Sequence, residues 1–82
     1  MPDLPLSDFL PAVEEQIASP QTPFVKAAYD RLVQDPDIDP EEARQMIALC
    51  LADEVEAMNS QDRPFDTARY QTLLDLLPAL PE

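Results

Sequence analysis

Residues 39–59, DPEEARQMIALCLADEVEAMN, decide the fold because they form the longest amphipathic helical pattern in the chain. Asp39 stands where an N-cap is expected, a proline follows it, and Glu42 lies three residues beyond it, which resembles a capping box. The two glutamates of the first turn also complement the positive end of the helix dipole. The segment predicts a helix over residues 40–58, with Asn59 as the residue best suited to a left-handed C-cap.

The apolar side chains of this helix gather on one face, and a carboxylate falls among them. The face contains Ala43, Ile47, Cys50, Leu51 and Met58. At 100° per residue Glu54 lies at its centre, where a charge is costly unless it is paired or hydrogen-bonded. One interpretation is structural: a contact with the hydroxyl of Tyr29 or Tyr70, with Arg69 or another basic residue, or escape to solvent. The other is functional: Glu54 lines a small pocket and faces Glu14 on the first helix.

Prolines mark the limits of three shorter helical patterns. These are predicted over residues 8–18, 23–34 and 67–77. Thr22 is the expected N-cap of the second pattern, and a proline occupies its first helical position. The last pattern begins at Asp66, and Phe65 and Tyr70 have the spacing of a hydrophobic staple across that N-terminus.

The predicted fold class is all-α, a small four-helix bundle. No run alternates with period two, and a chain without glycine lacks the usual hairpin turns. The connections are short and contain proline, so neighbouring helices are expected to be mostly antiparallel. We expect one domain over residues 1–82, with residues 1–6 and 78–82 as loose tails.

Composition excludes several kinds of chemistry. Of the 82 residues, 17 are acidic and 5 basic, giving a net charge of −12, and there is one cysteine but no histidine, glycine or tryptophan. The sequence therefore has no imidazole ligand or base, no glycine-rich phosphate loop, and no pair of cysteines for a disulfide or zinc site. We predict no catalytic residue, cofactor or metal, no direct contact with nucleic acid or membrane, and a cytoplasmic location.

Two features suggest a calcium site and a reactive thiol, but both have simpler explanations. The acidic residues at 35, 37 and 39 match the start of an EF-hand loop, but Pro40 replaces the required glycine and Met46 the final glutamate. A loop that leads into a capped helix explains this pattern better. Cys50 lies on the apolar face without a neighbouring cation, so we interpret it as a small core residue.

The remaining apolar residues suggest an interaction surface. Leu49 points away from the buried face of its helix, and Leu76 and Leu80 lie toward the edge of the last helix. They could form a homodimer contact or a groove for a protein partner. The expected function is therefore a protein-interaction or structural module without catalysis. Two alternatives remain open: a carboxylate-lined small-molecule or metal pocket around Glu54, and an acidic nucleic-acid mimic that binds a basic protein.

Several short motifs between residues 12 and 77 carry a resemblance. They are Val13-Glu14-Glu15-Gln16-Ile17-Ala18, Arg31-Leu32, Glu42-Ala43, Met46-Ile47, Leu51-Ala52, Glu54-Val55 and Pro64-Phe65-Asp66, then Ala68, Tyr70, Leu73, Leu74 and Leu77. In order and spacing they resemble a small bacterial all-helical domain family of unknown function. The resemblance implies a helical fold but no activity. Members of that family often carry histidines on the first and third helices, and Gln45 stands where one would be expected.

Overall fold

The computed structural model describes residues 8–79 and contains four helices within that range. They are α1 (Leu10–Ala18), α2 (Pro23–Val33), α3 (Pro40–Ser60) and α4 (Thr67–Leu76). This confirms the predicted all-α fold class, and no strand occurs among the described residues. In the same part of the chain, none of the helices combines the length and the apolar character needed to span a bilayer.

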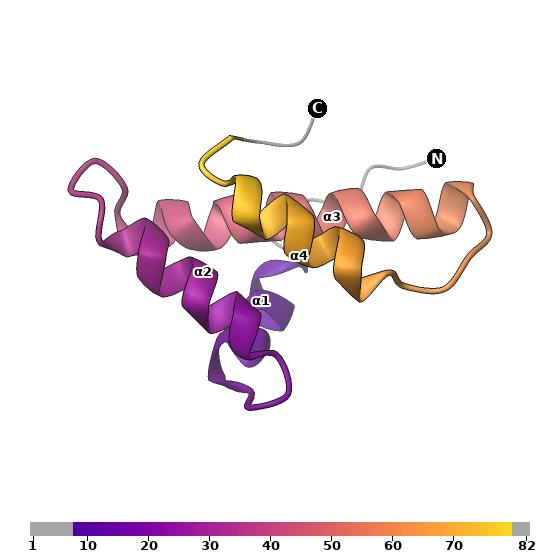
Figure 1. Cartoon of the computed structure of the whole chain (residues 1–82), viewed down its shortest axis with the longest axis horizontal. Coiled ribbons are helices and arrows are strands. Elements are labelled where there is room, and N and C mark those ends of the chain that lie inside the picture. Colours follow the sequence, from indigo (N-terminus) through magenta and orange to yellow (C-terminus); the bar gives the residue numbers. More distant parts are fainter. Residues whose placement is uncertain (1–7, 80–82) are drawn as a thin grey trace.

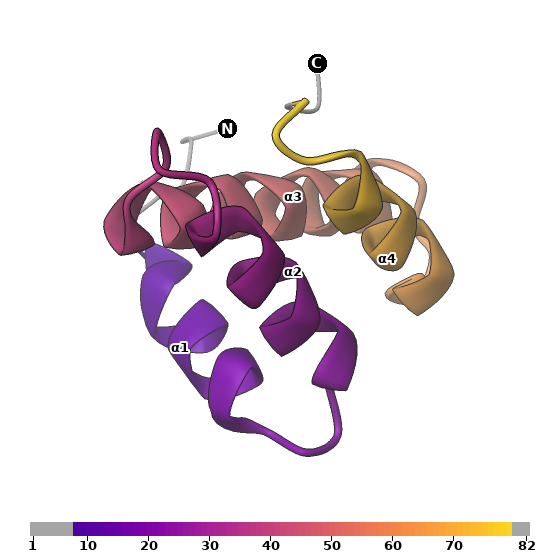
Figure 2. The ribbon, with the colours of Figure 1, turned by 60° about the vertical axis from the view of Figure 1, so that its left-hand side comes forward.

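The longest helix, α3, is the element on which the others pack. It contacts α1, α2 and α4, and α4 also contacts α2. The hairpin of α1 and α2 lies on one side of α3, and α4 returns along α3 next to α2 (Figures 1 and 2). Successive helices run in roughly opposite directions while inclined to one another, as short connections require.

The core forms where the apolar faces of the four helices meet. Its buried members are Val13, Val25, Ala28, Leu32, Ile38, Ala43, Ile47, Ala48, Cys50, Leu51, Tyr70, Leu74 and Leu77. Four of the five apolar residues predicted for the inner face of α3 are buried, whereas Met58 near its end is only half-buried. Among the charged side chains of residues 8–79, Glu54 alone is fully buried.

Side chains fix the starts of α3 and α4 as the sequence predicts. Asp39 Oδ1 accepts a hydrogen bond from the backbone N–H of Glu42 at 2.8 Å. Asp66 Oδ1 accepts from the N–H of Arg69 at 3.1 Å. The staple also forms, because the Phe65 ring meets the Tyr70 ring edge-on with centroids 5.6 Å apart. Each start therefore rests on a local contact that the sequence contains.

The start of α2 differs from this pattern. Thr22 occupies the N-cap position but makes no side-chain capping bond. Its hydroxyl donates instead to the carbonyl oxygen of Gln16 at 2.7 Å, across the turn from α1. The residue thus ties the two helices of the hairpin together rather than capping the second.

The end of α3 corrects the prediction for Asn59. The helix continues through Ser60, and the residue in the left-handed region is Asp62, with φ of 51°. The N–H of Arg63 then donates to the carbonyl of Met58 at 3.1 Å, as in a Schellman motif. Aspartate and asparagine both tolerate this conformation, so local preference alone did not locate the turn.

The other helix limits differ by one or two residues from those predicted. α1 begins at Leu10 rather than at residue 8, α2 ends at Val33, and α4 ends at Leu76. Residues 78 and 79, predicted as loose, lie in a turn in which the N–H of Ala79 donates to the Leu76 carbonyl at 2.9 Å. The remaining tail residues, 1–6 and 80–82, are outside the described residues.

A cation from α2 completes the end of α4. Arg31 donates from Nη1 to the carbonyl oxygen of Leu77 and from Nη2 to that of Leu74, both at 2.8 Å. Carbonyls at the end of a helix lack partners within it, and they carry the negative end of the helix dipole. Arg31 therefore gives the Leu77 carbonyl a partner, adds a second donor to the Leu74 carbonyl, which also accepts from the Leu77 N–H, and joins α2 to α4.

We expect Asp39→Ala to lower the free energy of unfolding by about 1 kcal/mol, because the N-terminus of α3 loses its cap. Asp37→Ala is the matched control: it removes the same charge from the same turn, and its effect should stay within about 0.5 kcal/mol. Urea denaturation followed by circular dichroism measures both values. Equal losses for the two variants would contradict the assigned capping role.

Candidate functional site

The most unusual site in the structure is the buried carboxylate of Glu54. Its side chain is 0% exposed and accepts four hydrogen bonds. Arg63 donates from Nη1 to Oε2 at 2.8 Å and from Nη2 to Oε1 at 3.1 Å, so it holds both oxygens. The backbone N–H of Asp66 donates to Oε2 at 2.8 Å, and Nη1 of Arg69 donates to Oε1 at 2.9 Å. We call Glu54, Arg63, the Asp66 amide and Arg69 the Glu54 clasp.

The local sequence brings these donors back to a residue that lies well before the end of α3. The left-handed conformation of Asp62 reverses the chain, which lets the Arg63 guanidinium approach Glu54. Asp66 then has two roles at the start of α4, because its side chain caps the helix while its own N–H binds Glu54. Capping places Arg69 in the first turn of α4, next to the carboxylate.

A second carboxylate balances the charge of the clasp. Nη2 of Arg69 donates to Oδ2 of Asp53 at 2.6 Å, so this arginine bridges two successive acidic residues of α3. Two carboxylates and two guanidinium groups therefore form one connected network, in which Glu54 is buried while both arginines are partly exposed. Such pairing offsets the cost of burying the Glu54 charge.

The pKa of Glu54 reflects this pairing. The pKa is lowered from an ordinary 4.5 to about 2; the hydrogen bond from Arg63 is the largest cause, and burial acts in the opposite direction. Hydrogen bonds from the Asp66 amide and from Arg69 contribute smaller parts of this lowering. The same contacts raise the pKa values of Arg63 and Arg69. Glu54 is therefore ionised throughout the neutral range and holds no proton to donate there.

The geometry gives the clasp a structural role. A carboxylate has about four lone-pair sites, and protein donors occupy them. A ligand or metal ion would have to displace Arg63, Arg69 or the Asp66 amide to reach the oxygens. The arrangement can thus join α3 to α4, but it is poorly suited to acid–base catalysis or metal coordination at Glu54.

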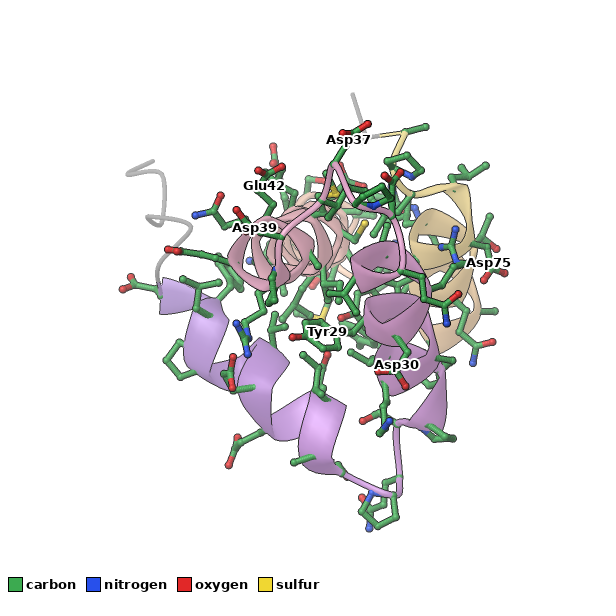
Figure 3. All side chains as sticks on the ribbon, turned by 90° about the vertical axis from the view of Figure 1, so that its left-hand side faces the viewer. Tyr29, Asp30, Asp37, Asp39, Glu42 and Asp75 are labelled. Carbon is green, nitrogen blue, oxygen red and sulfur yellow. The ribbon has the colours of Figure 1, made fainter. Side chains whose placement is uncertain are left out.

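Two of the predicted members of the Glu54 site lie elsewhere, between α1, α2 and α3. Glu14 is largely exposed and forms an ion pair with Arg44 of α3. The Arg44 guanidinium also lies over the Tyr29 ring, 5.3 Å from its centroid. Tyr29 points inward between α1 and α2 (Figure 3). Glu14 and Tyr29 are therefore not partners of Glu54, because Arg44 attracts both of them.

Tyr70 is buried but contacts a different polar group. Its hydroxyl donates to Oε1 of Gln16 at 2.7 Å, which links α4 to α1 across the bundle. The Phe24 ring meets the Tyr70 ring edge-on, with centroids 6.0 Å apart. Burial raises the pKa of the Tyr70 hydroxyl, so it remains protonated and donates this bond. Of the partners of Glu54 that were predicted by name, only Arg69 contacts it, and Arg63 is the other basic residue that does so.

Arg63 and Gln16 are the important residues that sequence reasoning missed. Arg63 lies outside every predicted helix, so a helical wheel cannot place it. One signal in the sequence was the small number of possible partners: the chain has five basic residues, and a buried carboxylate needs at least one of them. No comparable signal marks Gln16, whose contact with Tyr70 depends on how α1 and α4 face one another.

The predicted interaction surface is divided in the structure. Leu49 is half-buried on α3, whereas Leu76 on α4 is 58% exposed. Phe65 is the other large apolar residue that is exposed in the described part of the chain, at 38%. Leu80 lies outside the described residues. These side chains come from different helices, and their joint use as one surface stays a prediction.

The acidic residues in the loop before α3 form local hydrogen bonds. Asp35 Oδ1 accepts from the N–H of Asp37 at 2.9 Å, while Asp39 caps α3. Across residues 8–79, no three side chains of histidine, cysteine, aspartate or glutamate come together in a way that could hold a metal ion.

Comparison with known proteins adds no relative. No protein-family model matches the chain, and neither a curated protein nor a solved structure is detectably similar to it. The resemblance to a bacterial family of unknown function therefore stays a prediction.

Replacing Glu54 by glutamine should destabilise the fold by about 2–3 kcal/mol, because two guanidinium groups lose their shared charged acceptor. Glu56→Gln removes the same charge from an exposed position on the same helix, and its effect should stay within about 0.5 kcal/mol. Urea denaturation compares the two. A Glu54→Gln protein as stable as Glu56→Gln would rule out a stabilising clasp.

The advantage of the wild-type protein over Glu54→Gln should shrink as the pH falls from about 5 toward 2. The folded pKa is depressed, so the unfolded chain takes up a proton near 4.5 while the folded protein stays ionised to about 2. Other carboxylates contribute to the pH dependence of stability in both proteins, so their contributions largely cancel in the difference. Urea denaturation at several pH values measures the difference, and a pH-independent difference would disprove the linkage.

Native Cys50 should react with iodoacetamide at pH 8 at least about 100-fold more slowly than the same cysteine in urea. Burial, with a smaller contribution from Asp53, raises its pKa from 9.0 to about 11, which alone cuts the thiolate fraction by about that factor. Mass spectrometry of the alkylated protein follows the reaction. Equal rates in both states would show that the thiol is accessible in the fold.

Proposed function

We propose that the chain is an acidic helical interaction module, without catalysis, that binds a basic surface of another protein. The observation that carries the proposal is the fate of its five basic residues. All five lie within the described residues, and each is engaged in a contact within the chain. The surface therefore presents an excess of carboxylates that the chain's own cations do not balance.

The cations are engaged in several ways. Lys26 pairs with Asp30 at 2.7 Å on α2. Arg44 pairs with Glu14, the two arginines of the Glu54 clasp pair with buried and half-buried carboxylates, and Arg31 binds the end of α4. Each of these basic side chains is therefore engaged within the chain itself. A partner that supplies lysine or arginine would meet acidic side chains without first breaking these pairs.

The densest group of exposed carboxylates surrounds the turn from α2 to α3. It consists of Asp35, Asp37, Asp39, Glu41 and Glu42. Asp37, Asp39 and Glu42 lie at the turn and at the start of α3, on the outside of the bundle (Figure 3). Carboxylates this close repel one another, and a basic surface would relieve the repulsion and increase the rate of encounter. We name these five residues the acidic turn.

The net charge favours a different protein over a second copy as the partner, because two chains of charge −12 repel one another at low salt. Exposed Leu76 would add apolar contact to an interface that electrostatics orients. A nucleic-acid mimic is the special case in which the basic partner is a nucleic-acid-binding protein. The free Cys50 supports a reducing, cytoplasmic setting for the proposed module.

Affinity capture from a bacterial lysate, followed by titration of the purified partner, tests the proposal. We expect a basic partner whose affinity falls at least about tenfold between 50 and 300 mM salt. The variant Asp37→Lys/Glu41→Lys should weaken binding at least about tenfold. The control Glu15→Lys/Glu56→Lys changes net charge equally at exposed positions on α1 and near the end of α3 and should bind nearly as wild type.

Two outcomes would overturn this proposal. One is the absence of any basic partner whose binding depends on salt. The other is equal weakening of partner binding by both lysine variants, which would mean that binding depends on net charge and not on a defined surface. Competition by duplex DNA for the purified partner distinguishes a nucleic-acid mimic from other basic partners.

A further inference from the structure

We draw no further inference here: the strongest candidate, the open groove of about 350 Å³ between the end of α1 and the start of α2, lined mainly by Ile17, Pro20, Pro23 and Ala27 beside the Lys26–Asp30 ion pair, carries nothing because nothing in the structure shows what covers it.

Discussion

The carboxylate of Glu54, held by Arg63, Arg69 and the Asp66 amide, joins the start of α4 to α3 through a buried charge. Apolar packing against Tyr70 and its neighbours favours association of α4 with α3 but is not directional. Hydrogen bonds to a buried charge are directional, and losing one partner is costly. We infer that packing supplies most of the attraction, while the clasp selects where along α3 the last helix begins.

Much of this arrangement could be predicted because it rests on short-range rules. Asp39 and Asp66 as caps, the contact of Phe65 with Tyr70, and the burial of Glu54 all follow from spacing along a helix. These features involve residues separated by at most a few turns, so the helical period determines which side chains meet.

The features that could not be predicted depend on how the chain turns and how the helices pack, which the helical period does not describe. Arg63 reaches Glu54 only because the chain turns back at Asp62, and the residue at which α3 stops is not determined by side-chain preference alone. Glu14 was wrongly placed beside Glu54 because a wheel does not show that Arg44 lies nearer. Which carboxylate a given arginine binds depends on how the helices pack, and the helical period does not determine that.

The same scarcity of cations connects the fold with the proposed function. The four arginines stabilise contacts between different parts of the chain, and the one lysine pairs within α2. The surplus carboxylates remain at the surface, most densely at the acidic turn. The fold and the proposed electrostatic recognition are therefore two results of one charge distribution. Apolar residues at the surface would add contact, but the charges give the orientation.

The most direct test of the clasp is the pKa of Glu54, measured from the carbon-13 shift of its carboxyl group in an NMR titration. We predict a folded-state pKa far below the ordinary 4.5, at about 2, because Arg63, Arg69 and the Asp66 amide bind the ionised form. A Glu54 pKa at or above 4.5 in the folded protein would show that these donors do not hold the ionised carboxylate, since a buried carboxylate without them would be harder to ionise.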